Sequence, residues 1–118
     1  MSEVITLTGI SEYGRHGVYP QEKQNKQKFI VDLILEVNRI SDSDRIETTV
    51  DYAGLSNEIR EVVASTEFDL IESLAAAIAA HCLQNQLIHK VTVVVHKPEA
   101  AKSLGITDVS VSVTKSKQ

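Results

Sequence analysis

Residues 28–37 read KFIVDLILEV. Apolar side chains recur at every second position, which is the period of a β-strand. One face of this strand is entirely apolar and is predicted to lie in the core: Phe29, Val31, Leu33, Leu35 and Val37. The opposite face carries Ile30 and Ile34 beside Asp32 and Glu36, so we expect it to pack against something as well.

The segments before this strand predict a second strand and a long connection. Residues 4–10 alternate and are rich in β-branched side chains, which indicates a strand, and Gly9 is a candidate for a β-bulge. Residues 11–27 lack any periodicity and are expected to form a loop. A loop longer than about 12–15 residues is uncommon in a compact domain and is usually functional or disordered.

The segments after the strand predict two consecutive helices. Asp51 is a candidate N-cap for a helix whose apolar stripe runs from Tyr52 to Val63. Asp69, with Glu72 three residues later, predicts a capping box at the start of a second helix. The stripe of this second helix is wide: Leu70, Ile71, Leu74, Ala75, Ile78, Ala79 and Cys82.

Two further strands are predicted at the end of the chain, over residues 91–96 and 109–114. The order strand, strand, helix, helix, strand, strand disfavours a ferredoxin-like sandwich and a doubly wound sheet. We predict an α+β fold, a four-stranded antiparallel sheet with two helices on one face. Since no element is left to cover the other face, we expect a homo-oligomer whose sheets join or stack.

Composition narrows the class of protein. A chain of 118 residues with 42% hydrophobic and 24% charged residues predicts one folded domain spanning residues 1–118. A net charge of -4 argues against a nucleic-acid partner. The most apolar window, residues 74–80, is too short to cross a membrane, and the first residues do not resemble a leader peptide. The single cysteine, Cys82, fits a reducing compartment, so we expect a cytoplasmic protein.

The chemistry-bearing residues are few, and each has a structural interpretation beside a functional one. The four histidines lack metal-ligand spacing, and no nucleotide-binding or nucleophile motif is present, so we expect neither metal nor cofactor. Glu72 could cap its helix or bind an amidine-like heterocycle beside free backbone N–H groups. Lys97 could be a snorkelling lysine or a proton-transfer group. Tyr52 could pack in the core, and Glu22 could be a solvated charge.

Four motifs in one order resemble the dihydroneopterin aldolase family. They are YGRHGV at residues 13–18 followed by Glu22, TVDY at 49–52, LIESLA at 70–75 and HKP at 96–98. The resemblance spans the chain from its first strand to its last. It implies the tunnelling fold, in which the four-stranded sheets of neighbouring subunits join into a barrel, with two tetrameric rings forming an octamer.

The family resemblance also implies an activity and a set of roles. The family cleaves 7,8-dihydroneopterin in folate biosynthesis by a retro-aldol reaction, without metal or Schiff base. By resemblance, Glu72 and the backbone of Ile71 anchor the pterin. Lys97 is the general acid/base, acting through a water, and Glu22 orients it. A neighbouring subunit is expected to supply Tyr52 for proton transfer, with Val50 and Asp51 lining the pterin slot.

The chain departs from the family pattern in two places, and two alternative functions stay open. After HKP the chain reads Glu99-Ala100-Ala101-Lys102-Ser103, where many members of the family have an Ala-Pro-Ile-like turn, so the lid over the lysine is expected to differ. Asp51 occupies a position at which the family varies. A 2′-epimerase of dihydroneopterin or its triphosphate is the alternative enzyme, and a triphosphate enzyme would offer a basic cluster such as Arg15, Lys23 and Lys102. The other alternative is a pterin-binding scaffold without catalysis, which would need only Glu72 and the slot.

Overall fold

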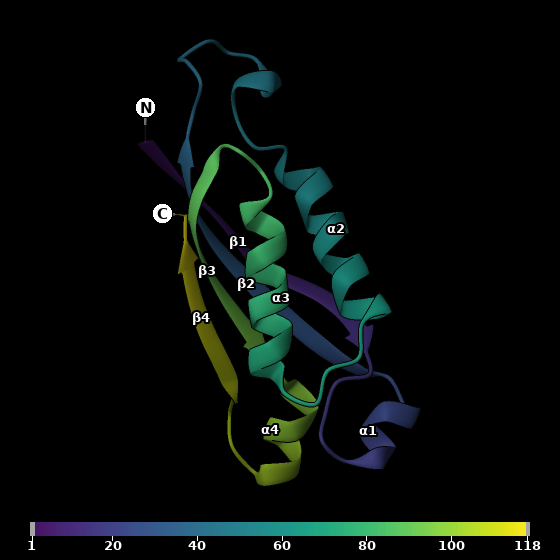
Figure 1. The fold of residues 1–118 in the computed structure, drawn as a ribbon. Coiled ribbons are helices and arrows are strands. Elements are labelled where there is room, and N and C mark those ends of the chain that lie inside the picture. Colours follow the sequence, from purple (N-terminus) through teal and green to yellow (C-terminus); the bar gives the residue numbers. More distant parts are fainter. Residues whose placement is uncertain (1, 118) are drawn as a thin grey trace.

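Four strands form one antiparallel sheet in the computed structural model, which describes residues 2–117. The strands lie in the order β1-β2-β3-β4 and are β1 (Ser2–Gly14), β2 (Gln27–Asn38), β3 (Ile88–His96) and β4 (Ser110–Ser116). Two long helices, α2 (Tyr52–Ser65) and α3 (Ile71–Leu83), cover one face of the sheet (Figure 1). The predicted α+β fold and the order of its main elements are confirmed.

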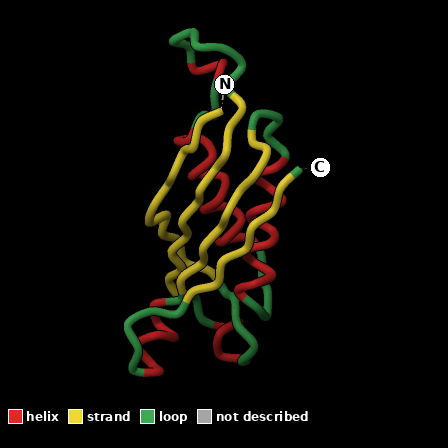
Figure 2. The backbone as a smooth tube through the Cα atoms, turned by 90° about the vertical axis from the view of Figure 1, so that its left-hand side faces the viewer, coloured by secondary structure: helices red, strands yellow, loops and turns green. Residues whose placement is uncertain are grey.

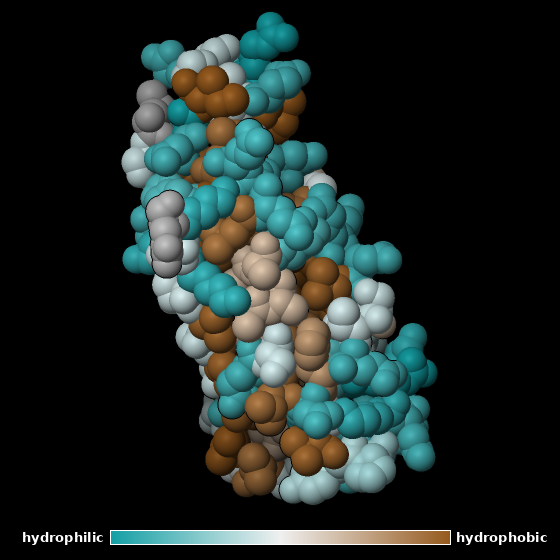
Figure 3. Space-filling model, viewed as in Figure 1, coloured by the Kyte–Doolittle hydropathy of each residue, from teal (hydrophilic) through white to brown (hydrophobic). Residues whose placement is uncertain are grey.

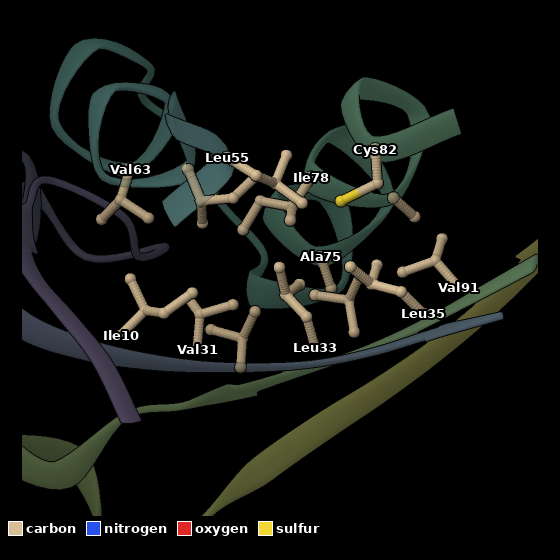
Figure 4. Packing of buried hydrophobic residues seen from close by; sticks show 14 of the residues in the cluster. Ile10, Val31, Leu33, Leu35, Leu55, Val63, Ala75, Ile78, Cys82 and Val91 are labelled. Carbon is tan, nitrogen blue, oxygen red and sulfur yellow. The ribbon is translucent and has the colours of Figure 1, made fainter. Parts of the chain in front are cut away.

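The core lies between β2 and the two long helices. All five side chains of the predicted apolar face of β2 are fully buried. Figure 4 shows Val31, Leu33 and Leu35 pointing from the sheet toward Leu55 and Ile78 on the helices. Because β2 is an inner strand, its strict alternation fixes which face of the whole sheet the helices must cover.

The opposite face of the sheet is covered by no other element of residues 2–117, as Figure 2 shows with the strands in front of the helices. Ile34 on this face is 41% exposed. Among the helices of this same range, none combines the length and apolar character needed to cross a bilayer.

The loop predicted over residues 11–27 is wrong in two places. β1 continues to Gly14, and Pro20–Gln24 form the short helix α1. Pro20 at the first position of α1 and Glu22 at the third are a helix-start signal that the absence of apolar periodicity obscured. The bulge predicted at Gly9 is confirmed, because the β1–β2 register shifts between Leu7 and Ile10 and Gly9 has φ 84°.

Two predictions about the helix starts have opposite outcomes. Asp51 caps α2, its Oδ1 accepting the N–H of Gly54 at 3.2 Å. Asp69 does not cap α3, which begins behind Leu70 without a side-chain cap, and Asp69 instead forms an ion pair with Lys23. The capping box of Asp69 with Glu72 is therefore wrong, and Glu72 is free of that role.

Tyr52 differs from its structural interpretation, and the segment after Lys97 forms an element that the sequence did not predict. Tyr52 is 57% exposed, so it is not a core residue of this chain. Residues Pro98–Leu104, where the lid over the lysine was expected to differ from the family, form a further short helix, α4. The Glu99 carboxylate accepts the backbone N–H of Lys28 at 2.9 Å, which ties α4 to the start of β2.

Candidate functional site

Lys97 and Glu22 form an ion pair at the end of the sheet where α1 and α4 lie (Figure 1). Lys97 directly follows β3, and Pro98 behind it begins α4. Its Nζ lies 2.5 Å from Glu22 Oε2, and the two side chains are only 15% and 17% exposed. An amine and a carboxylate at this distance, largely shielded from solvent, can hand a proton to a bound molecule and restore it.

Glu22 is held by three donors. Lys97 is the first, Gln27 Nε2 donates to Oε2 at 3.1 Å, and the backbone N–H of Tyr19 donates to Oε1 at 3.3 Å. Burial alone would raise the pKa of this carboxyl, but the hydrogen bonds from Lys97, Gln27 and Tyr19 outweigh it and hold the pKa below 4.5. Glu22 therefore stays ionised at neutral pH and keeps a fixed orientation toward the lysine.

Gly17 makes room for the Glu22 carboxylate. A Cβ at position 17 would stand 2.2 Å from Glu22 Cδ and 2.3 Å from Oε1, well inside van der Waals contact. The backbone of residue 17 and the carboxylate can approach this closely only because glycine has no side chain. Gly17 of the YGRHGV motif thus has a packing reason connected to the site.

His16 joins this loop to the connection between α2 and α3. The imidazole is fully buried, accepts the backbone N–H of Phe68 at Nδ1 (3.0 Å), and donates from Nε2 to Val63 O (2.8 Å). The N–H of Gly17 donates to Phe68 O at 2.9 Å. These bonds, with the Lys23–Asp69 ion pair, fix the start of α3 beside helix α1, which carries Glu22.

The first turn of α3 offers a binding edge. Its N-cap is Leu70, so the N–H groups of Ile71 and Glu72 have no capping side chain. Glu72 is exposed and accepts no hydrogen bond within residues 2–117. The Ile71 side chain packs in the core, which leaves only its backbone for binding, as the resemblance implied. A carboxylate beside two free N–H groups can both accept from and donate to a planar heterocycle.

A pocket of about 560 Å³ opens beside the Lys97–Glu22 pair. Tyr19 and Gln27 line it from the α1 side, and Ala100 and Ser103 line it from α4. Apolar side chains reach the surface at this end of the molecule, as Figure 3 shows, and the exposed ones include Leu70 and Leu104. A small molecule bound here would contact the charged pair directly.

Val50, Asp51 and Tyr52 lie at the other end of α2. This helix has fourteen residues, so its two ends are roughly 20 Å apart. Figure 1 places the start of α2 far from α1 and α4. Tyr52 therefore does not meet Lys97 of the same chain. Val50 is 1% exposed, which leaves only its backbone to line a slot, whereas Asp51 and Tyr52 are exposed.

Sequence reasoning found the charged pair and missed the residues that support it. Gln27, Gly17 and His16 carry no pattern of their own, since their roles depend on contacts with Glu22, Val63 and Phe68. The one available signal was Tyr19-Pro20 followed by Glu22, which predicts a helix start whose third residue reaches back to the backbone.

Comparison with known proteins agrees with this architecture. The family model described as dihydroneopterin aldolase (FolB) matches residues 5–114. The chain belongs to the dihydroneopterin aldolase family. A dihydroneopterin aldolase of Streptomyces coelicolor is 34% identical over 115 residues, covering 96% of this chain and 97% of the relative.

Two solved structures of dihydroneopterin aldolases share the fold. The Escherichia coli enzyme in complex with neopterin superimposes with a TM-score of 0.86 at 21% identity, over 96% of this chain and 98% of that one. The Burkholderia thailandensis protein bound to guanine gives a TM-score of 0.82 at 24% identity, over 99% and 93% of the two chains. The four-stranded antiparallel sheet with two long helices on one face is thus shared with these two structures.

Proposed function

We propose that this protein is a dihydroneopterin aldolase, a lyase of folate biosynthesis that cleaves 7,8-dihydroneopterin into 6-hydroxymethyl-7,8-dihydropterin and glycolaldehyde. The observation that carries the proposal is the shielded Lys97–Glu22 pair at the mouth of a pocket. Membership of the dihydroneopterin aldolase family supports this reaction. The Lys97–Glu22 pair supports it as well, because proton transfer is what this reaction requires of the protein.

The reaction asks for two proton transfers and an electron sink. The hydroxyl on the side-chain carbon that becomes the aldehyde group of glycolaldehyde loses its proton. The carbon–carbon bond between this carbon and the carbon attached to the ring then breaks, and glycolaldehyde is released. The bonding electrons pass into the C=N bond of the pterin ring, and the carbon left on the ring then takes up a proton. Because the ring accepts the electrons, the proposed step requires neither metal nor Schiff base. Lys97 moves the protons through a water, and Glu22 fixes the position of its ammonium group.

The first turn of α3 is proposed to hold the ring. Pterin presents an amino group and a ring N–H side by side, and the Glu72 carboxylate can accept both as charge-assisted hydrogen bonds. The N–H groups of Ile71 and Glu72 are free to donate to ring acceptors. Neopterin and guanine, the ligands of the two structural neighbours, share this amidine-like edge, which supports the assignment.

A second copy of the chain is proposed to complete the site. Tyr52 and Asp51 are exposed but lie at the far end of α2, so they can meet Lys97 only if another subunit presents them. The edge strands β1 and β4 have free outer edges within residues 2–117, and such edges can pair with a neighbouring sheet. Joining four sheets gives the tetrameric ring, and two rings give the octamer that the family resemblance implies.

The alternatives receive less support. A triphosphate epimerase would need a cluster of free cations, and of the three candidates Lys23 is already paired with Asp69, which leaves only Arg15 and Lys102. A pterin-binding scaffold would have no use for a shielded lysine held by Glu22.

Incubation with 7,8-dihydroneopterin, followed by chromatography of the products, tests the proposal. We expect 6-hydroxymethyl-7,8-dihydropterin and glycolaldehyde in equal amounts. Monapterin alone would identify an epimerase, and unchanged substrate would leave a binding protein.

A further inference from the structure

His96 makes a bridge between two carboxylates on the sheet face opposite the long helices. Its Nε2 lies 2.7 Å from Asp32 Oδ2 on β2, and its Nδ1 lies 2.8 Å from Asp108 Oδ2 in the segment before β4. Asp32 is fixed in turn, because its Oδ1 accepts the N–H of Gly9 in the β1 bulge at 2.8 Å. The bridge thus connects β1, β2, β3 and the approach to β4.

The bridge requires a doubly protonated imidazole. A neutral histidine has one N–H and could donate to only one of the two carboxylates, whereas the imidazolium donates to both. Beside the two carboxylates, the surrounding hollow is lined by Thr8 and Gly9 from β1 and by Ile30, Pro98 and Thr107, which carry no titratable side chain. Burial opposes the charge on His96, but the hydrogen bonds to Asp32 and Asp108 outweigh it and raise the pKa above 6.5.

The same segment also holds the backbone of Lys97. The N–H of Lys97 donates to the carbonyl of Val109 at 3.0 Å, and Val109 directly follows Asp108. The residue before Lys97 and the backbone of Lys97 are therefore both attached to residues 108–109. A displacement of this segment would move the lysine relative to Glu22, and a shift of about 1 Å at a catalytic group can cost roughly 100-fold in rate.

We propose that Asp32, His96 and Asp108 are positioning residues for Lys97, and that they hold it in its productive place only while His96 carries both protons. This inference rests on the proposed function. When His96 loses a proton, one contact is lost and two carboxylates face each other without the cation between them. Turnover should therefore fall at alkaline pH in step with His96, while KM, set by the contacts of the α3 edge with the ring, changes little.

The decisive variant is Asp108→Asn, which keeps the shape of the side chain and removes its charge. Loss of a charge partner at this distance lowers a histidine pKa by about one unit or more. We expect the alkaline limb of the kcat profile to move down by the same amount, with near wild-type kcat at lower pH. The matched control is Glu36→Gln on β2, which removes the carboxylate 3.5 Å from His89 on β3. This variant should leave the alkaline limb of the kcat profile unchanged.

Nitrogen NMR of the imidazole rings supplies the readout independent of activity. We expect two protonated ring nitrogens for His96 at neutral pH, and a step in the Lys97 Cε shift at the His96 midpoint. A single ring proton, or a kcat limb that stays in place while the His96 midpoint moves, would overturn the inference. If the wild-type protein lacks aldolase activity, the proposed function fails, and the Lys97 shift alone decides whether the lysine follows His96.

Discussion

The Lys97–Glu22 pair is the feature on which the proposed chemistry depends at the scale of single residues. Its 2.5 Å separation and low exposure place a proton carrier and its ionised partner beside one pocket. The proposed ring-binding edge is separate from this pair, because Glu72 lies on α3 and does not line that pocket. Substitutions at the two places should therefore affect different kinetic constants.

Lys97→Ala should lower turnover and leave pterin binding nearly intact, because the lysine interacts with the moving proton and not with the ring. We expect a loss of about 10²–10⁴-fold in single-turnover cleavage, the usual contribution of a general acid/base. Fluorescence titration with neopterin provides the binding control. Cleavage within about tenfold of wild type would be incompatible with this role.

Glu72→Gln should weaken pterin binding, because the amide presents a donor where the carboxylate accepted two charge-assisted bonds. We expect a loss of about 2–4 kcal/mol in binding free energy by calorimetric titration with neopterin. Since Glu72 caps no helix within residues 2–117, thermal stability should stay close to wild type. Unchanged affinity would remove Glu72 from the site.

Gly17→Ala should reduce turnover without unfolding the protein, since the new Cβ would meet the Glu22 carboxyl at 2.2–2.6 Å and push it from Lys97. Far-UV circular dichroism and thermal denaturation monitor the fold. The double variant Gly17→Ala/Glu22→Asp tests whether this clash is the cause, because the shorter Asp carboxylate withdraws from residue 17. The proposed clash would be refuted if Gly17→Ala were as active as wild type.

At the scale of elements, the start of α3 is held by the buried His16 imidazole. Accepting from Phe68 and donating to Val63 requires a neutral ring, and burial lowers the pKa of His16 below 6.5 despite the hydrogen bond to Val63. Because the folded-state pKa is the lower one, the stabilisation is present in full above pH 6.5. It is lost as the pH falls from there toward the folded-state pKa.

His16→Gln should separate this effect from general acid destabilisation. The amide can donate and accept like the neutral ring but does not titrate. We expect a lower melting temperature than wild type at pH 7 and a smaller further loss between pH 7 and pH 5, measured by thermal denaturation. A decline as steep as that of wild type would show that His16 is not the titrating group.

The elements show what a sequence can predict and what it cannot. β2 and α2 were predictable because their contacts obey a period, with an apolar face every second residue and a stripe behind the Asp51 cap. The capping box at α3 failed because Asp69 finds Lys23, a partner 46 residues away that no local pattern reveals. Helices α1 and α4 were not predicted, because helices of five and seven residues are too short to display an apolar period.

The candidate site divides along the same line. Lys97, Glu22 and Glu72 were reached through motifs of the family, each with a structural interpretation that local patterns alone favoured. Gln27, Gly17 and the Asp32–His96–Asp108 bridge were out of reach, since each exists only as a contact between segments distant in the chain.

In the whole molecule, the proposed catalytic groups lie at opposite ends of the folded domain. Lys97, Glu22 and Glu72 lie at the end with α1 and α4, and Tyr52 lies at the start of α2, roughly 20 Å away along that helix. If the proposed roles hold, one chain therefore carries two halves of a site and no complete one. Catalysis is therefore proposed to require two copies of the chain, each presenting a different end.

Subunit complementation tests whether two copies are required. Tyr52→Phe and Lys97→Ala homo-oligomers are first shown to be severely impaired. They are then dissociated together and reassembled, with exchange verified by mass spectrometry. Since each interface draws its two sides independently, about a quarter of the sites should combine an intact Lys97 with an intact Tyr52. We expect activity to rise to about a quarter of wild type after reassembly, and not after mixing without exchange. If exchange is complete and activity does not rise, the site lies within one chain and the claim is contradicted.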